Sequence, residues 1–453
     1  MRMMSLMAAA AAAVLAATPA LAQDVAITGG RVLTGTSVIE NGTVVIRNGR
    51  IVSVGTGPAP AGVRTIDATG KVVTPGIVAV DSGLAASEVS SVSGSNDLSN
   101  NANTLTAAFD VSYGIDPWSF TIPTARLGGV TRAVVTPQHG GSGGGHSHDD
   151  SGYSDMTAGA GHGGYQSPGL FAGQAAVINL KDGSSILVKS KVAMTAPFGE
   201  AGARVAGGAR GGQFVLFKET LNEVRLYARN KSAYERSSLR DLSLSRADLE
   251  ALIPVVEGRM PLIVTVNRAA DIQQVLRLAR EEGLKVILDG AAEGWLVANE
   301  IAAANVPVLV HPTTNLPGNF EMRAARMQNA AALHAAGVTI ALKGNEGSVH
   351  RAREIRYNAG NAVSHGLPFE AAIAAITVNP AKIFGFAGEF GELKSGAAGD
   401  VVVWSGDPLE PLSQPQAVVI DGVQQPLDTA RNLQLRNRYL PNAAGNRPHS
   451  YTY

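Results

Sequence analysis

The chain has 453 residues, enough for one large domain and a smaller one, and 45% of them are hydrophobic against 16% charged. Its 37 basic and 37 acidic residues balance, so no excess of positive charge points to nucleic acid or an anionic membrane as a partner. The absence of cysteine excludes disulfides, thiolate metal sites and a cysteine nucleophile.

The first 22 residues predict an export signal. Arg2 supplies a positive start, residues 3–17 are apolar, and residues 20–22 read Ala-Leu-Ala, a small-residue cleavage site. The apolar stretch is short and alanine-rich for a membrane span, and no second long apolar run follows it. We therefore expect an exported mature chain without a membrane span, located in the periplasm of a bacterium.

Both ends of the chain predict short β-strands. Beyond the leader, apolar runs alternate with turn signals, and Asn48-Gly49 between two such runs is typical of a hairpin. Residues 401–404 and 416–420 predict further strands near the other end. We expect residues 23–74 and 386–430 to form one small composite β-sandwich, followed by a tail over 431–453.

Residues 75–385 predict a parallel barrel, because short apolar strands alternate there with helical segments. The expected strands are 77–80, 129–137, 262–267, 285–289, 306–312 and 337–342, and the expected helices are 270–282, 294–304 and 371–384. Residues 138–169 break this pattern. They are rich in glycine and histidine, which favours a long loop at the carboxyl end of a barrel strand, the end where barrel enzymes place their chemistry.

Several segments, taken in order, resemble the amidohydrolase superfamily, nearest to its imidazolonepropionase-like, exported bacterial branch. They are the strand that follows Pro75-Gly76, and residues 128–131, 268–272, 377–383 and 391–408. The resemblance implies an α/β fold with a (β/α)8 TIM-like barrel and a small β-sandwich formed by both chain ends. It also implies hydrolysis of amide or other C–N bonds in small cyclic or peptide-like substrates.

The same resemblance implies a catalytic divalent metal, but its ligands are substituted in this chain. The family holds the metal with His-x-His on the first strand, with Lys or Glu and two His on middle strands, and with Asp on the last. The residues at the matching places are Asp81, Gly83, Thr265 or Asn267, Asp289 and Asn345. Asp81 and Asp289 can hold a hard cation weakly, whereas the charge of Lys343 opposes one. We therefore expect the zinc site of the family to be lost, unless zinc or another divalent metal is held by an altered ligand set.

The pocket candidates are the polar residues at expected strand ends: Asp81, Asn267, Asp289, His311 and Asn345. His311 fits either a pocket residue or a hydrogen-bonded structural histidine, and we favour the structural role. On the Gly/His-rich loop, His146 and His148 with two adjacent aspartates are candidates to capture a metal over the barrel mouth. We favour a solvated loop there, because ordering a flexible segment costs conformational entropy.

Two functions stay open at this point. One is hydrolysis of C–N bonds at an unusual site, as the resemblance implies. The other is a non-catalytic pseudoenzyme subunit, which pairs with an active paralogue or binds a small ligand. Either function leaves a small molecule as the expected partner, within a homo-oligomer or a hetero-oligomer with a paralogue.

Overall fold

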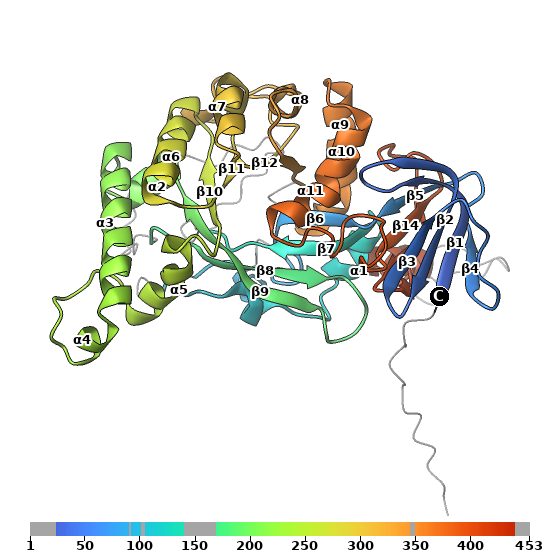
Figure 1. The fold of residues 1–453 in the computed structure, drawn as a ribbon, viewed down its shortest axis with the longest axis horizontal. Helices are drawn as coiled ribbons and strands as arrows, with labels where there is room; N and C mark the ends of the chain where they lie inside the picture. The colour runs from blue at the N-terminus through green and yellow to red at the C-terminus, as the bar shows by residue number, and fades with distance from the viewer. Residues whose placement is uncertain (1–23, 90–91, 101–104, 140–168, 345–348, 440–453) are drawn as a thin grey trace, which may run out of the picture.

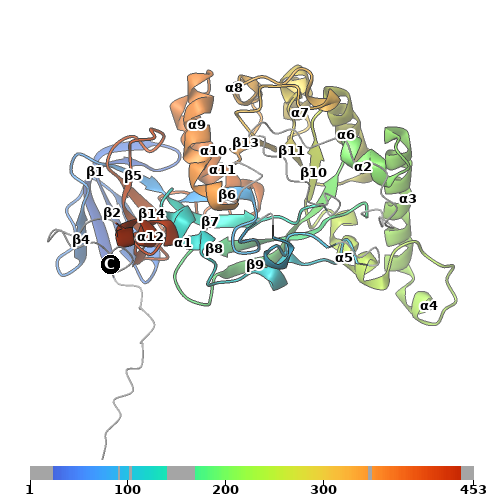
Figure 2. The ribbon, with the colours of Figure 1, turned by 180° about the vertical axis from the view of Figure 1, so that it is seen from behind.

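The structure is a computed structural model that describes residues 24–89, 92–100, 105–139, 169–344 and 349–439. The expected leader over 1–22, most of the Gly/His-rich loop with His146 and His148, and Asn345 lie outside the described residues. The described part contains two eight-stranded sheets, which lie side by side in Figures 1 and 2.

The first sheet combines strands from both ends of the chain. Its strands are β1 (Val25–Leu33), β2 (Val38–Arg47), β3 (Arg50–Gly55), β4 (Arg64–Asp67), β5 (Val72–Pro75), β14 (Val401–Trp404), β15 (Pro415–Ile420) and β16 (Val423–Gln425). The two groups join where β14 pairs antiparallel with β5, with Val403 opposite Val73. Alternate side chains of these strands, among them Ile27, Ile46 and Val419, form a separate buried apolar core. Hydrogen bonding therefore unites the two ends of the chain in a single sheet.

The second sheet is a nearly closed barrel. Its strands, in the order in which they pair, are β6 (Ile77–Ser82), β7 (Val130–Val135), β8 (Gly173–Asn179), β9 (Leu187–Pro197), β10 (Leu262–Val266), β11 (Val286–Gly290), β12 (Val308–Val310) and β13 (Ile340–Leu342). All neighbouring strands are parallel except β8, which runs antiparallel to both β7 and β9. The expected regular alternation of strand and helix fails here. Residues 180–186 join β8 to β9 without a helix, because an antiparallel pair needs no crossover.

Helices cover the outside of the barrel, with α3, α6, α7 and α9 standing around it in Figure 1. The α-helices are α1 (Thr121–Arg126), α2 (Gly199–Val205), α3 (Arg210–Arg229), α4 (Lys231–Glu235), α5 (Arg246–Val256), α6 (Ala269–Glu282), α7 (Ala298–Ala303), α8 (Asn329–Ala335), α9 (Ile355–Ser364), α10 (Phe369–Ile376), α11 (Val378–Ile383) and α12 (Arg431–Tyr439). Short 3-10 helices are η1 (Ser93–Ser95), η2 (Val111–Gly114), η3 (Gly294–Val297), η4 (Phe320–Met322) and η5 (Val349–Glu354). Within the described ranges, no helix combines the length and hydrophobicity that a bilayer span requires.

The expected single helix over 371–384 is instead two helices, α10 and α11, with a break at Thr377. Pro380 lacks the N–H that would bond to the carbonyl of Ile376, so the helical ladder cannot continue through this point. Thr377 leaves the helical conformation, with φ −131° and ψ −86°, and its hydroxyl donates to the carbonyl of Ile373 at 2.6 Å. The sequence therefore located the helical region correctly but missed the break.

The interior of the barrel is a layer of small and branched apolar side chains. It is formed by Val78, Val134, Val177, Ala193, Ile263, Ile287, Leu309 and Ala341, each buried. Below this layer, at the amino-terminal ends of the parallel strands, Phe384, Phe386 and Phe390 belong to the same cluster. The guanidinium of Arg132 lies 4.7 Å from the centre of the Phe390 ring. A packed floor that contains Arg132 and the phenylalanine rings therefore closes one end of the barrel, and the mouth lies at the opposite end.

Candidate functional site at the barrel mouth

Six of the eight strands each contribute one residue to the mouth, placed two positions beyond an inward apolar residue. Side chains of a strand alternate between its two faces, so each of these residues continues the inward row. The row that results is polar: Thr136 after Val134, Thr195 after Ala193, Thr265 after Ile263, Asp289 after Ile287, His311 after Leu309 and Lys343 after Ala341. The inward-facing side chains therefore change from apolar to polar at one level of the barrel, and this change can be read from the sequence.

The central contact of the mouth is an ammonium group between two carboxylates. The Nζ of Lys343 lies 2.5 Å from Oδ2 of Asp81 and 2.6 Å from Oδ1 of Asp289. The Lys343 side chain is 2% exposed and that of Asp289 is 7% exposed. These contacts connect the carboxyl ends of β6, β11 and β13, and the ammonium charge neutralises one of the two carboxylates.

Asp81 reaches this contact through an unusual backbone conformation. Its φ is +48°, in the left-handed region, where aspartate is tolerated better than most residues. The pairing of β6 with β7 shifts register at the same place, between Ala79 and Ser82. Val80 points into the barrel, so a regular strand would turn Asp81 outward. The irregularity turns the Asp81 carboxylate toward Lys343.

Both ends of the Lys343–Asp289 contact are held by further hydrogen bonds. The Thr265 hydroxyl donates to the other oxygen of Asp289, Oδ2, at 3.1 Å, which orients the carboxylate. The backbone N–H of Lys343 donates to the carbonyl of Val310 at 3.0 Å, and the Asn358 amide donates to the Lys343 carbonyl at 2.9 Å. The position of the ammonium is therefore fixed by the strand below it and by helix α9 behind it.

The structure brings some of the candidates from the sequence together and leaves others apart. Asp81 and Asp289 meet at Lys343, as described. Asn267 does not join them: its side-chain oxygen accepts from the N–H of Ala292 at 3.3 Å and braces the turn after β11. His311 lies at the end of β12, with its Nδ1 3.2 Å from the Thr313 hydroxyl. Asn345, His146 and His148 lie outside the described residues.

Gly83, the other residue at the expected His-x-His place, leaves no room for a ligand side chain. A Cβ built there would come within 2.5 Å of Leu98. Any larger residue would have to displace this buried leucine. A ligand side chain at the second position of the pair would therefore require Leu98 to move.

The donor set that the described residues form at the mouth does not fit a catalytic divalent metal. Structural and catalytic zinc sites use three or four protein ligands, mostly imidazole, thiolate and carboxylate. Among the described residues, no three His, Asp or Glu side chains are close enough together to hold an ion. The two carboxylates that do converge already bind an ammonium at 2.5 and 2.6 Å.

Sequence reasoning missed three polar groups of this region. The hydroxyls of Thr136 and Thr195 are buried and have no hydrogen-bond partner within the described structure, and neither ring nitrogen of His139 has one. Burial lowers the pKa of His139 to about 4, so its ring is neutral at pH 7. The period-two pattern would have found both threonines, because each follows an inward apolar residue by two positions.

The cavity next to Asp81 is small. It measures about 30 Å³ and is lined by Asp81, Ser82, Gly83 and Gln138, together with residues of η5 and α9. A space of this size holds about one water molecule. Only a hydroxyl, amine or amide end of a larger molecule would therefore reach Asp81 in this conformation.

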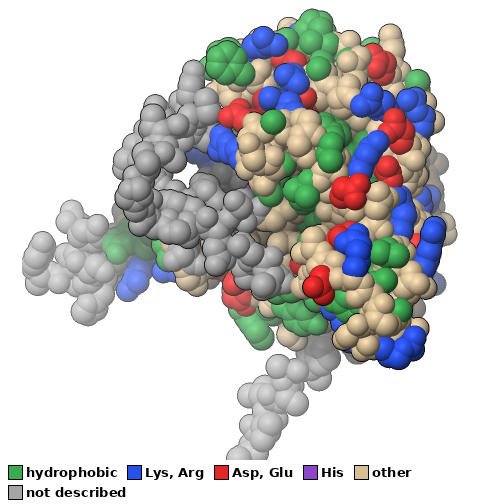
Figure 3. Space-filling model, turned by 90° about the vertical axis from the view of Figure 1, so that its left-hand side faces the viewer, with side chains coloured by type: hydrophobic (Ala, Val, Ile, Leu, Met, Phe, Trp, Pro, Cys, Tyr) green, Lys and Arg blue, Asp and Glu red, His purple; other side chains and the backbone are tan. Residues whose placement is uncertain are grey.

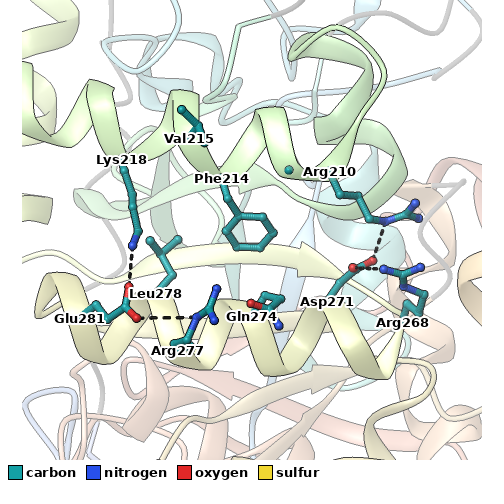
Figure 4. A pocket seen from close by; sticks show the side chains of 11 residues that line it. Arg210, Phe214, Val215, Lys218, Arg268, Asp271, Gln274, Arg277, Leu278 and Glu281 are labelled. Carbon is teal, nitrogen blue, oxygen red and sulfur yellow. Dashed lines mark hydrogen bonds and ion pairs between the residues drawn. The ribbon is translucent and has the colours of Figure 1, made fainter.

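A larger cavity, about 430 Å³, lies outside the barrel between α3 and α6. Figure 4 shows its apolar floor, with Phe214 and Leu278, and charged groups toward both ends. These groups bind one another: Arg210 and Arg268 contact Asp271 at 2.8 and 2.6 Å, and Lys218 contacts Glu281 at 2.5 Å. Figure 3, which views the molecule from the α3 side, shows acidic and basic side chains interspersed over this face. The charged groups of this surface groove are therefore engaged in ion pairs with one another, and basic groups outnumber acidic ones in its lining.

Comparisons with known proteins agree with this architecture. Residues 298–426, which include β12, β13 and the last strands of the composite sheet, match the model of the amidohydrolase family. An amidohydrolase from Thermotoga maritima MSB8 is similar in structure, with a TM-score of 0.74 and 24% identity over 88% of this chain and 99% of that chain. Molinate hydrolase is similar with a TM-score of 0.51 and 17% identity, over 93% of this chain and 99% of that chain.

One curated relative is similar in sequence over a short segment. Amidohydrolase tasK of Hapsidospora irregularis is 36% identical over 81 residues, which is 18% of this chain and 8% of that protein. The chain thus matches only a small part of the length of this relative. Taken together, a segment of the chain matches the amidohydrolase family, and the whole has the fold of solved amidohydrolases.

Proposed function

We propose that this protein has an amidohydrolase-type barrel that binds a small polar molecule at its mouth without hydrolysing it by a bound metal. The observation that carries the proposal is the Lys343 ammonium, which contacts both converging carboxylates. We also propose three finer features that the sequence led us to expect. The barrel derives from a (β/α)8 enzyme, the protein belongs to the exported imidazolonepropionase-like branch, and it is located in the periplasm.

The Lys343 charge opposes a divalent ion at the position that its ammonium occupies between the two carboxylates. Two unit charges 4 Å apart interact by about 4 kcal/mol at the effective dielectric constant near a protein surface, so a divalent ion would be repelled by about 8 kcal/mol. Metal-assisted hydrolysis needs the ion to lower the pKa of a bound water and to polarise the scissile carbonyl. With Lys343 in place, this repulsion works against the attraction of Asp81 and Asp289 for that ion, and their oxygens already contact the ammonium.

The unpartnered hydroxyls support binding of a polar ligand. A buried polar group without a partner costs about 1–3 kcal/mol, and Thr136 and Thr195 each carry one at the mouth. A ligand with hydroxyl, amine or amide groups would recover this cost. The described charges of Asp81, Asp289 and Lys343 sum to one negative charge, which favours a neutral or cationic ligand over an anion.

Hydrolysis of C–N bonds is the second candidate, favoured by the match of residues 298–426 to the amidohydrolase family. It requires a metal held by other residues, for which His146 and His148 are the sequence candidates. If the protein is not catalytic, it could instead pair with a catalytic paralogue. Such a partner would carry the metal ligands in its own barrel.

Elemental analysis of untagged mature protein, before and after dialysis against a chelator, separates these candidates. We expect far less than one metal ion per chain, a melting temperature unchanged by the chelator, and no turnover of amides or dipeptides. In parallel, a panel of small neutral and cationic metabolites should include at least one that raises the melting temperature of the wild type.

One tightly held ion per chain, together with chelator-sensitive hydrolysis, would refute the proposal. Two variants then locate the ion. Loss of metal in a variant with His146→Ala and His148→Ala, but not in Asp289→Asn, would assign it to the loop. The reverse result would assign it to the strand ends.

A further inference from the structure

We infer that the Lys343 ammonium is the resident cation of this barrel: it holds the ends of β6, β11 and β13 together in the way a bound metal ion would. Removing its charge and its volume then leaves a latent divalent-cation site between Asp81 and Asp289. The inference rests on the proposed metal-free function, and it names the residue that keeps the site free of metal.

The geometry gives Lys343 the position of a bound ion. Its nitrogen contacts one oxygen from each of two carboxylates, at 2.5 and 2.6 Å, and these carboxylates come from strands on either side of β13 in the barrel. The side chains of Lys343 and Asp289 are 2% and 7% exposed, so water contributes little to stabilising their charges, whereas that of Asp81 is 21% exposed. The backbone of Lys343 is anchored by Val310 and Asn358, so the ammonium is delivered by a rigid strand end rather than by a loose surface chain.

The two carboxylates need a cation between them. Both oxygens touch the same nitrogen, so they lie close enough to repel each other strongly when it is removed. Breaking a buried ion pair by removing one partner is strongly destabilising because a charge is left uncompensated. A small hard cation coordinated by carboxylate oxygens and water is the chemical substitute, and Mn²⁺, Mg²⁺ and Ca²⁺ prefer such oxygen ligands.

The test compares two variants that differ in volume but not in charge. Lys343→Ala removes the ammonium and opens space, whereas Lys343→Met removes the ammonium but fills nearly the same space with a methyl group. We expect both to melt about 5–10 °C below the wild type in chelator. Addition of MnCl₂ should raise the melting temperature of Lys343→Ala by several degrees and change neither Lys343→Met nor the wild type.

Binding of the ion is measured directly by calorimetry and by the electron paramagnetic resonance signal of Mn²⁺. We expect about one ion per chain of Lys343→Ala, and loss of that ion when Asp289→Asn is added. A Lys343→Ala protein that melts like the wild type, or that neither binds Mn²⁺ nor is stabilised by it, would overturn the inference.

A folding failure of the variant is also informative. If Lys343→Ala is recovered in soluble form only when Mn²⁺ is present during refolding, the inference is supported, and recovery in neither medium overturns it. The variant Asp81→Asn/Lys343→Met/Asp289→Asn removes all three charges and should fold without responding to metal. These measurements on the variants test the inference about Lys343. The metal content of the wild type tests the proposed function. Failure of the inference can therefore be distinguished from failure of the proposed function.

Discussion

The guanidinium of Arg132, on β7 of the barrel, donates from Nε to Oδ2 of Asp400 at 2.5 Å, and so joins the barrel to the composite sheet. Both side chains are almost fully buried, at 5% and 2% exposed. Asp400 also accepts from the backbone N–H of Asp421, and Arg132 donates to the Asp421 carboxylate at 2.6 Å. The junction between the two sheets is therefore ionic at its centre.

Arg132→Met should destabilise the protein by about 3–5 kcal/mol, because it leaves the Asp400 carboxylate buried without its cation. Burial already raises the pKa of Asp400. In the variant the carboxylate should take up a proton, so the loss should shrink as the pH is lowered and grow as it is raised. Denaturant unfolding at several pH values measures this.

The matched control for this prediction is Lys231→Met, which removes an exposed ion pair with Glu250 that has a similar separation, 2.8 Å. An exposed pair contributes about 0–1 kcal/mol, so the control should unfold almost like the wild type. If both variants lose the same free energy of unfolding, the buried Arg132 contact contributes no more to stability than an exposed ion pair.

Thr136→Val should stabilise the protein by about 1 kcal/mol, because it replaces a buried hydroxyl that lacks a partner by a methyl group of similar shape. The same change should weaken binding of whichever small molecule stabilises the wild type. Thermal unfolding with and without that molecule measures both effects. A destabilised variant would mean that the hydroxyl is already satisfied in solution.

His139 should make stability depend on pH. Burial lowers its pKa to about 4 from an unfolded value near 6.5, so the unfolded chain binds the proton more readily over this range. The stabilising contribution of the neutral ring is complete above pH 6.5 and falls as the pH drops toward 4, by about 3 kcal/mol. The difference in unfolding free energy between the wild type and His139→Asn should follow this curve. If the difference in unfolding free energy between the two proteins stays constant from pH 7 to pH 4, His139 makes no pH-dependent contribution and the prediction is wrong.

Arg356→Met should loosen the segment that follows β14. The Arg356 side chain is buried and donates to the carbonyls of Pro408, Glu410 and Ser413 at 3.0, 2.7 and 2.9 Å. Removing it leaves three carbonyls without this donor, two of them buried, at a cost of about 3 kcal/mol. Amide exchange over residues 405–414 should accelerate more than elsewhere. Arg259→Met, at an exposed pair with Glu257, is the control that should leave this exchange unchanged.

The sequence predicted much of the barrel because its strands are short apolar runs with turn signals between them. Strand β11 and helix α6 lie within one residue of their expected bounds. The strands β8 and β9 were not expected, since their hairpin follows the Gly/His-rich loop and departs from βα alternation. Sequence pattern reports the period of a segment, but it does not give the direction in which a strand enters the sheet.

The mouth was predicted only in part. Asp81 and Asp289 were candidates because they end apolar strands, and Lys343 was expected to oppose a cation. The sequence could not show that Lys343 binds both carboxylates. That contact depends on closure of the barrel, which brings β13 near β6, and on the left-handed conformation of Asp81. Such a conformation is imposed by the surrounding fold rather than by the local sequence.

The composite sheet also sets an order of events during synthesis. Strands β1 to β5 leave the ribosome first, but one edge of β5 stays unpaired until β14 has been made. An open edge of this kind can pair with other chains. The whole barrel, which lies between these strands in sequence, must emerge during that interval. We therefore expect a nascent chain that stops before residue 401 to need a chaperone, however well its barrel has folded.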